Sequence, residues 1–253
     1  MLEDSLRAAT ASLPPGWSAH LFERVESTQD LARAAARTGA PDRSIFVADE
    51  QTAGRGRQRR HWMARPGSGL LLSILFRERS VTPLPWRYTS LASLALIEAI
   101  ERLLPELRPA IKWPNDVVLG RCKVAGVLAE SASDGEQLLV VVGVGVNVAS
   151  SADELITVGG RATSLALAVG RPVDRGALLR LFVDRLDAWL ARSLDEARAA
   201  WQARLWGRGQ RLRLADPDRV QDVVVLGADA DGALRVRLPD GSERRTTTGE
   251  LIL

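Results

Sequence analysis

The fold is decided by the segment AIKWPNDVVLGRCKVAGVLAESASDGEQLLVVVGVGVNV, residues 110–148. It contains three apolar runs rich in valine and leucine, separated by a Gly-Arg turn and an Asp-Gly turn. Apolar runs joined by such short turns are typical of antiparallel strands. Upstream, SIFVADEQ (44–51) and GLLLSILF (69–76) predict two further buried strands.

Helices are predicted on both sides of these strands. In VESTQDLARAAAR (25–37), Ser27 or Thr28 is placed at a helix N-cap, because a hydroxyl satisfies free backbone N–H groups and the alanines that follow favour a helix. Residues 85–104 begin with proline and carry apolar residues at helical spacing, which predicts a core helix. Two more helices are predicted near 174–193 and 195–206.

The pattern changes from about residue 208. Short segments of alternating character, separated by Asp-Gly turns, continue to the end of the sequence and predict a small β-barrel or sandwich. We therefore expect an α+β fold in two domains, with residues 1–206 forming a sheet flanked by helices and residues 207–253 forming the small β domain.

Composition excludes several classes of protein. With 253 residues, 46% hydrophobic and 26% charged, the chain is typical of a globular protein with a large core, and its net charge of +3 is too small for a general polyanion binder. No stretch approaches the roughly 18 uninterrupted apolar residues of a membrane span, and the start MLEDSLRAAT lacks the basic and then apolar order of a signal peptide. We expect a cytoplasmic protein that does not bind membranes.

Cysteine and histidine are too scarce for several kinds of site. Cys122 is the single cysteine, so no internal disulfide is expected, and His20 and His61 are the only histidines. Neither a Cys/His zinc cluster nor a Ser-His-Asp triad is expected, and no GxSxG motif supports the triad.

Lysine is also rare. Of the 34 basic residues, 32 are arginine and two, Lys112 and Lys123, are lysine. Lysine supplies a compact, rotatable charge where arginine supplies a planar fork. The two lysines are therefore candidates for a specific role, with chance as the alternative.

Two glycine-rich motifs are candidates for phosphate binding. GRGRQRRHW (54–62) combines two glycines with four arginines, which predicts that an anion approaches the backbone, either a nucleic acid or a small phosphorylated molecule. GVGVNV (143–148) has Val148 where a dinucleotide fingerprint needs its third glycine, and no helix follows, so the Rossmann interpretation is rejected. No GK[ST] loop is present.

In combination, the motifs resemble bacterial biotin protein ligases, in the form without an N-terminal DNA-binding domain. The resemblance is carried by STQD (27–30), QTAGRGRQRRHW (51–62), KWPNDV (112–117), KVAGVLAE (123–130), GVGVNV (143–148) and ATSL (162–165). GADADGALRVRLPDG (227–241) with TTTGEL (246–251) is similar to the small SH3-like domain of that family.

The resemblance implies a class II synthetase-like catalytic domain with a mixed sheet, followed by an SH3-like β-barrel. It also implies a two-step reaction. Biotin and ATP form biotinyl-5'-AMP and pyrophosphate, and the biotinyl group then passes to a lysine of a biotin carboxyl carrier protein. ATP, Mg²⁺ and biotin are the implied small molecules. The sequence identifies no metal ligands, leaves the carrier unidentified, and does not distinguish a monomer from a homodimer.

The same resemblance assigns residues by their match to the family motifs. Lys123 and Asp116 are implied as catalytic residues, because Lys123 would stabilise charge between the biotin carboxyl and the α-phosphate and Asp116 would orient or deprotonate the incoming lysine. The implied biotin-binding residues are Ser27, Thr28, Gln29, Gln51, Gly54, Arg55, Gly56, Arg57, Lys123 and Gly126. The implied ATP-binding residues are Arg57, Arg60, Trp62, Asn115, Lys123 and Asn147.

Several of these residues have a structural alternative. Ser27 also fits a plain N-cap, Asp116 an Asx-type turn, and Lys112 either a structural or a charge role. Cys122, next to Lys123, is interpreted as incidental. Ser27 is able to combine both roles, because capping uses an acceptor lone pair of its hydroxyl and leaves the donor free.

Two positions depart from the family pattern. Arg59 stands where the family loop has glycine, so a positive φ there would cost about 1 kcal/mol or more. The family's adenine-covering loop often has an aromatic residue, and ITVGGRATSL (156–165) has none.

Alternatives to the ligase were also considered. A DNA-binding regulator is disfavoured because only 25 residues precede the ESTQD motif, and no DNA partner is expected. A catalytically impaired biotin-binding or regulatory protein is motivated by Arg59 alone. Lipoate attachment uses a related fold, but the GRGR and KWPND motifs together point to biotin.

Overall fold

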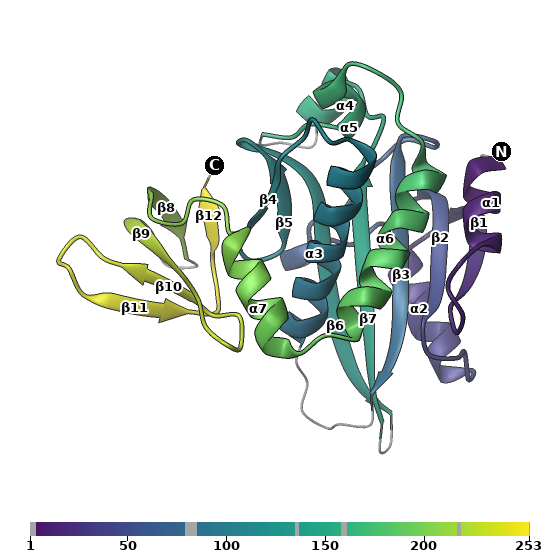
Figure 1. The fold of residues 1–253 in the computed structure, drawn as a ribbon, viewed down its shortest axis with the longest axis horizontal. Coiled ribbons are helices and arrows are strands. Elements are labelled where there is room, and N and C mark those ends of the chain that lie inside the picture. The colour runs from purple at the N-terminus through teal and green to yellow at the C-terminus, as the bar shows by residue number, and fades with distance from the viewer. Residues whose placement is uncertain (1–3, 79–84, 135–136, 158–160, 217–218, 253) are drawn as a thin grey trace.

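The computed structural model describes residues 4–78, 85–134, 137–157, 161–216 and 219–252, and it confirms the α+β fold with a mixed sheet (Figure 1). The main sheet contains β1 (Ser18–Val25), β2 (Ser44–Gln51), β3 (Gly69–Glu78), β4 (Pro109–Lys112), β5 (Asp116–Leu119), β6 (Cys122–Asp134) and β7 (Gln137–Asn147). Their spatial order is β1-β2-β3-β7-β6-β5-β4. β1 and β2 are parallel, and all other neighbours are antiparallel.

Residues 110–119 contribute two strands, β4 and β5, which form a hairpin. Pro114 lies between them, where its missing N–H removes no ladder hydrogen bond. Gly120, with φ of 61°, makes the predicted turn into β6, because glycine adopts positive φ without steric cost.

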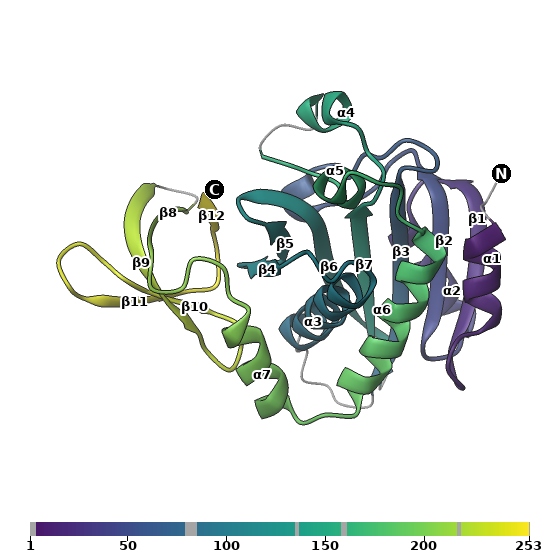
Figure 2. The same cartoon turned by 45° about the horizontal axis from the view of Figure 1, so that its top comes forward.

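Helices cover both faces of this sheet. α3 (Pro85–Leu103) and α6 (Arg175–Leu190) pack together on one face, and α2 (Thr28–Arg37) lies on the other (Figure 2). α1 (Asp4–Ala11) packs on α6, and α7 (Leu194–Ala203) packs on α3. The short helices α4 (Ala152–Thr157) and α5 (Leu165–Val169) follow β7, and a 3-10 turn, η1, spans Arg57–Arg59. Among the described residues, no helix combines the length and apolarity needed to span a bilayer.

Residues 4–25, for which no element is predicted, form α1 and β1 in the structure. β1 is at the edge of the sheet, and none of its residues is fully buried. An edge strand with polar residues lacks the apolar run by which the other strands were recognised.

A second sheet contains β8 (Arg211–Ala215), β9 (Val220–Ala228), β10 (Leu234–Arg237), β11 (Glu243–Thr246) and β12 (Glu250–Ile252). All neighbours are antiparallel, in the order β11-β10-β9-β8-β12. The small C-terminal β domain predicted from the sequence is present, but its sheet is not closed into the SH3-like barrel that the resemblance implies, because β11 and β12 are the two outer strands and do not pair in the described residues. With four and three residues, they have few hydrogen bonds to offer for closure.

The two sheets share one apolar core. The cluster that contains Ile111 and Trp113 of the main sheet extends to Leu214 and Val225 of the second sheet. The indole Nε1 of Trp113, a fully buried side chain, donates to the carbonyl of Gly232 in the β9–β10 turn over 2.9 Å. The boundary predicted between residues 206 and 207 falls in the segment that joins α7 to β8.

Candidate active site

The predicted site residues gather around one cavity of about 640 Å³. Its lining includes every one of them except Gly54: Ser27, Thr28, Gln29, Gln51, Arg55, Gly56, Arg57, Arg60, Trp62, Asn115, Asp116, Lys123, Gly126 and Asn147. Gly54 lines a neighbouring cavity on the other side of the GRGR loop. Its own position is crowded, since a Cβ there would lie 2.4 Å from the carbonyl oxygen of Trp62.

The floor of this cavity is formed by β6 and β7. Along β7, Val142, Val144 and Val146 belong to the core that packs under α3 and α6. Successive side chains of a strand alternate between faces, so Gly143, Gly145 and Asn147 face the cavity. Gly145 pairs with Gly126 of β6, which leaves a flat apolar surface without side chains. The glycines of GVGVNV therefore make room for a ligand and neighbouring side chains.

Neutral hydrogen bonds organise the end of the cavity at the start of α2. Gln51 Oε1 accepts hydrogen bonds from the backbone N–H of Thr28 at 2.8 Å and from its hydroxyl at 3.1 Å. The Thr28 and Ser73 hydroxyls lie 2.8 Å apart, and Ser73 Oγ donates to Gln29 Oε1 over 3.0 Å. Gly143 is required beneath Gln29, because a Cβ there would lie 2.6 Å from Gln29 Oε1. These four polar side chains hold one another in place.

Ser27 differs from these neighbours. It is the N-cap residue of α2, as predicted, but its side chain makes no capping hydrogen bond. Its hydroxyl is buried and has no partner among the described residues, although it lines the cavity. A buried hydroxyl without a partner costs free energy, so this oxygen is available for a ligand.

The loop 54–62 folds as a small hairpin over the cavity. Trp62 N–H donates to Gly54 O over 2.9 Å, and Gly56 N–H donates to Arg60 O over 2.7 Å. Gln58 has a left-handed backbone with φ of 54°. No positive φ is observed for Arg59, whose side chain lies outside the described part of the chain. The strain expected at Arg59 is therefore not observed in the described backbone.

Trp62 lies between this hairpin and the strand floor. A Cβ at Gly145 would lie 2.5 Å from its ring, and the Lys123 Nζ is 5.4 Å from its ring centroid. The ring therefore packs on glycine and is close enough to Lys123 for a cation–π interaction. Its buried indole N–H has no partner among the described residues.

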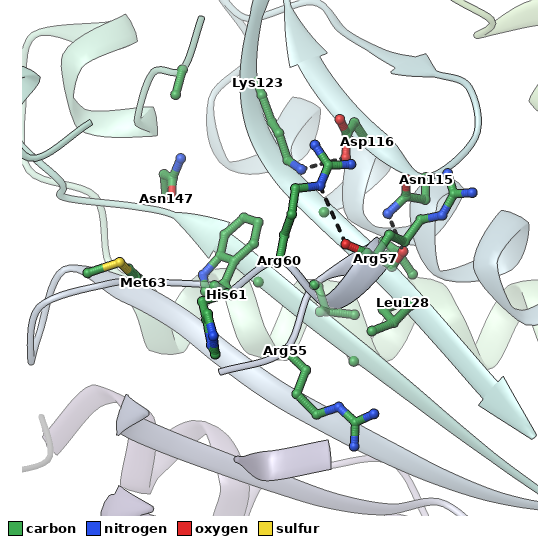
Figure 3. Close-up of a pocket in the computed structure, with 18 of the residues that line it drawn as sticks. Arg55, Arg57, Arg60, His61, Met63, Asn115, Asp116, Lys123, Leu128 and Asn147 are labelled. Carbon is green, nitrogen blue, oxygen red and sulfur yellow. Dashed lines mark hydrogen bonds and ion pairs between the residues drawn. The ribbon is translucent and has the colours of Figure 1, made fainter. Parts of the chain in front are cut away.

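Charged residues occupy the end of the cavity near β4 and β5. Lys123 Nζ lies 2.6 Å from Asp116 Oδ1 (Figure 3). Lys112 is almost fully buried, with Nζ 3.6 Å from Asp116 Oδ2 and 2.9 Å from Glu250 Oε1. Asp116 therefore lies between the two lysines of the sequence, and Lys112 forms ion pairs with both Asp116 and Glu250.

Glu250 brings the second sheet into this cluster. Its other oxygen, Oε2, lies 3.0 Å from Arg60 Nη2 of the GRGR hairpin. Burial alone would raise the pKa of Glu250, but its hydrogen bond and charge interaction with Lys112, together with Arg60, outweigh burial and hold the pKa below its ordinary value. Glu250 is therefore a carboxylate that joins the two sheets at the cavity.

Arg57 and Arg55 point in different directions. Arg57 Nη1 donates to Asn115 Oδ1 over 3.4 Å, and burial lowers the pKa of Arg57 while Glu250 and Asp116 oppose that shift. Arg55 points away from this charged cluster (Figure 3). Its guanidinium lies 2.8 Å from Asp30 and 3.3 Å from Glu130, at the α2 side of the loop.

The remaining predicted residues are held by backbone contacts. Asn115 Nδ2 donates to Val127 O over 2.9 Å, and Asn147 Nδ2 donates to Thr163 O over 3.1 Å. Thr163 in turn lies beside Lys123, whose carbonyl accepts its N–H over 2.9 Å. Within the segment 156–165, for which no adenine-stacking residue was found, residues 158–160 lie outside the described residues.

Sequence reasoning missed three functional candidates: Ser73, Glu130 and Glu250. Ser73 is a polar residue within the apolar run GLLLSILF, and that break in the run was a usable signal. Glu130 is the last residue of the quoted KVAGVLAE motif, and Glu250 lies in TTTGEL, but their contacts join distant segments. Neither sequence motif indicates which basic side chain its glutamate pairs with.

Comparison with known proteins gives consistent matches in sequence. The model of the biotin/lipoate A/B protein ligase family matches residues 21–147. The biotin--[acetyl-CoA-carboxylase] ligase of Mycobacterium tuberculosis is 35% identical over 248 residues, which cover 94% of this chain and 90% of that protein. The bifunctional ligase/repressor BirA of Bacillus spizizenii is 29% identical over 229 residues, which cover 87% of this chain and 69% of that protein.

The fold also matches over nearly the whole chain. A structure of the biotin protein ligase from Aquifex aeolicus in complex with biotin and ATP has a TM-score of 0.76 and 27% sequence identity. The match covers 92% of this chain and 97% of that one. On the family match and these similarities, the chain belongs to the biotin/lipoate A/B protein ligase family.

Proposed function

We propose that this chain is an ATP-dependent biotin protein ligase, which forms biotinyl-5'-AMP and transfers the biotinyl group to a lysine of a biotin carboxyl carrier protein. The observation that carries the proposal is a single cavity with two unlike ends. Ser27, whose buried hydroxyl has no partner within the described part of the chain, lines one end, and a cluster around Lys123 and Asp116 lines the other.

The neutral end suits the ureido ring of biotin, which has N–H donors and a carbonyl acceptor. Ser27 Oγ supplies an unsatisfied group there, and Thr28, Gln29 and Gln51 are held in fixed orientations around it. Such pre-placed polar groups favour one ligand strongly, because an analogue without the matching group leaves them unpaired. The ring of Trp62, which packs on Gly126 and Gly145, provides an apolar wall for the rings of biotin.

The charged end suits formation of the adenylate. A carboxylate oxygen of biotin attacks the α-phosphorus of ATP, the bond to the bridging oxygen breaks, and pyrophosphate leaves. This step brings negative charges together, and Lys123, Arg57 and Arg60 supply positive charge where they develop. Asn115, Asn147 and Trp62 line the same cavity and would contact the nucleotide.

The second step is acyl transfer. The amine of the carrier lysine attacks the acyl carbon of the mixed anhydride, the bond from that carbon to the phosphate oxygen breaks, AMP leaves, and the amine loses one proton. Asp116 is buried and paired with Lys123, and in this proposal its carboxylate orients the amine or accepts its proton.

Mg²⁺ is proposed to enter with ATP. Among the described residues, no group of three or more His, Cys, Asp or Glu side chains is arranged to hold a metal ion. Mg²⁺ is commonly held by substrate phosphates with one or two protein ligands, so this cavity fits a metal carried by the nucleotide. When bound, the metal would neutralise phosphate charge.

The relatives support the substrate and the setting. The Mycobacterium tuberculosis protein is named as a ligase that acts on acetyl-CoA carboxylase, and the Aquifex aeolicus structure contains biotin and ATP. We extend this to a carrier-domain partner and a cytoplasmic location for our chain. In this proposal residues 1–206 bind biotin and ATP, and residues 207–253 form a second unit that supplies Glu250.

The decisive test is mass spectrometry of a biotin carrier domain after incubation with this chain, biotin, ATP and Mg²⁺. A mass increase of one biotinyl group, dependent on ATP, is the expected result. Biotin-dependent exchange of pyrophosphate into ATP then separates a ligase from an impaired biotin-binding protein. Biotin binding without either reaction would overturn the proposal in favour of that alternative.

A further inference from the structure

Glu130, near the middle of β6, gathers hydrogen-bond donors from two separate parts of the site. Its Oε2 accepts from the Gln29 amide at 2.9 Å and pairs with Arg33 at 2.5 Å. Its Oε1 lies 3.3 Å from Arg55 Nη2 of the GRGR hairpin. Its side chain is 25% exposed, less than those of Arg33 and Arg55, so it is the sheltered member of the group.

From Glu130 the contacts continue to the neutral end of the cavity. The same Gln29 amide nitrogen also donates to Val141 O over 3.1 Å, and Gln29 Oε1 accepts the Ser73 hydroxyl. Ser73 is joined to Thr28, beside Ser27. Rotation of the Gln29 side chain would therefore break hydrogen bonds both at the cavity floor and at Glu130.

In the other direction the contacts reach the loop. Arg55 pairs with Asp30 over 2.8 Å as well as with Glu130, and it forms an isolated bridge with His61 across the hairpin. The hairpin carries Arg57, Arg60 and Trp62, none of which contacts α2 through a hydrogen bond or ion pair in the described residues. Arg55 is thus the side chain that ties the loop to the biotin end.

We propose that Glu130 is a positioning residue that couples the Gln29 side of the biotin site to the GRGR hairpin through Arg55. Biotin bound at the neutral end fixes Gln29, Gln29 fixes the carboxylate of Glu130, and the carboxylate holds the hairpin over the reactive adenylate. Arg55 acts through this pairing and not by contact with biotin. The inference rests on the proposed function, because it concerns retention of the adenylate that the enzyme makes.

The test uses Glu130→Gln, Arg55→Gln and the double variant in the full chain. Pre-formed biotinyl-5'-AMP is chased with unlabelled ligand, and its release is followed. Each single variant is expected to release the adenylate about three to five times faster, the size of effect that a partly exposed ion pair supplies. If Glu130 works through Arg55, the double variant is no faster than either single variant.

A second readout reports the loop directly. Trypsin cleaves after arginine, and the hairpin presents Arg57, Arg59 and Arg60 in succession. Biotin is expected to slow cleavage there in the wild type and to protect much less in Glu130→Gln. Glu106→Gln is the matched control, since Glu106 also forms a 2.9 Å ion pair, with Arg171, but Arg171, unlike Arg55, does not line the cavity. It is expected to behave as the wild type.

Three outcomes overturn the inference: unchanged adenylate release in Glu130→Gln, rate increases that multiply in the double variant, or unchanged protection by biotin. If Glu130→Gln does not fold, as judged by thermal unfolding, Asp30→Asn removes the other partner of Arg55 and must give the same acceleration. Failure of the wild type to form any adenylate refutes the proposed function instead, so the two results remain distinct.

Discussion

The two ends of the cavity are built in different ways. At the neutral end, Thr28, Gln29, Gln51 and Ser73 satisfy one another by hydrogen bonds and leave one buried hydroxyl, that of Ser27, without a partner. At the charged end, the cationic and anionic side chains neutralise one another in ion pairs, and only part of the cluster comes from the main sheet.

This difference indicates that the neutral end recognises the ligand and that the charged end stabilises the reaction. A set of neutral hydrogen bonds has direction, so it distinguishes one ligand from a near analogue. A cluster of charges has little direction but stabilises whatever negative charge develops beside it. The neutral end is complete within the main sheet and α2, whereas the charged end needs Glu250 from the second sheet.

Loss of the central ammonium should break the charged end most severely. We expect Lys123→Ala to slow adenylate formation at least about a hundredfold, since one preorganised donor is commonly worth about 3 kcal/mol. Pyrophosphate exchange measures the rate. Biotin affinity, measured by calorimetry, should change much less because the Ser27 end is intact. A near-normal exchange rate would remove Lys123 from the mechanism.

Removal of the carboxylate of Glu250 should expose how far the charged end depends on the second sheet. In Glu250→Gln, the buried ammonium of Lys112 keeps only Asp116 at 3.6 Å. Taking one partner from a buried ion pair is costly, and the partial exposure of Glu250 reduces that cost to about 2 kcal/mol of unfolding free energy. Urea unfolding measures it. Glu243→Gln, at an exposed carboxylate of the same sheet, serves as control, and equal effects of the two variants would contradict the role of Lys112.

Ser27→Ala and Thr28→Val test whether the side chains of the neutral end serve biotin binding or protein stability. Ser27→Ala should weaken biotin binding about tenfold without loss of stability, because the hydroxyl has no protein partner to lose. Thr28→Val removes hydrogen bonds to Gln51 and Ser73 and should lower the unfolding temperature. Calorimetry and thermal unfolding test the pair. Equal destabilisation by the two substitutions would show that the Ser27 hydroxyl is structural.

The smallest effect concerns pH. The pKa of Glu250 in the folded protein lies below its ordinary value, so its stabilisation is complete above the unfolded-state value of 4.5 and is lost as pH falls through the lower folded-state value. The stability difference between wild type and Glu250→Gln should therefore be constant at neutral pH and shrink in acid below 4.5. Urea titrations at several pH values measure it, and a difference that widens in acid would contradict the ion pairs.

Much of the fold was predictable because buried strands and helices have apolar residues in runs or at regular spacing in the sequence. The apolar runs at 44–51, 69–76 and 137–148 became β2, β3 and β7, and the helix start at Ser27 was placed correctly. β1 escaped prediction because none of its residues is fully buried. The C-terminal β domain was predicted, but not that its sheet stays open, because turn signals predict hairpins and do not determine whether the outer strands meet.

For the site, the motifs identified residues but not the directions of their side chains. Arg55 and Arg57 are two positions apart in one glycine-rich loop, yet one pairs with Asp30 and Glu130 and the other lies beside Asn115. Nothing in their spacing separates them, because a loop without a regular period gives no rule for side-chain orientation. The directions of the two arginine side chains are set by their contacts with α2, β5 and β6.

The sequence alone determined the buried strands β2, β3 and β7, the main helices and the motif residues that line the cavity, because local hydrophobic periodicity and motif identity are properties of neighbouring residues. It did not identify β1, nor Ser73 and Glu250 in the cavity lining. Tertiary structure alone decided which polar atoms are satisfied. The Lys112–Glu250 pair joins residues 138 positions apart, and the Ser27 hydroxyl is unpartnered because of how α2 meets the sheet. Burial and pairing arise only when distant segments pack, and they set the charge and hydrogen-bonding capacity of this site.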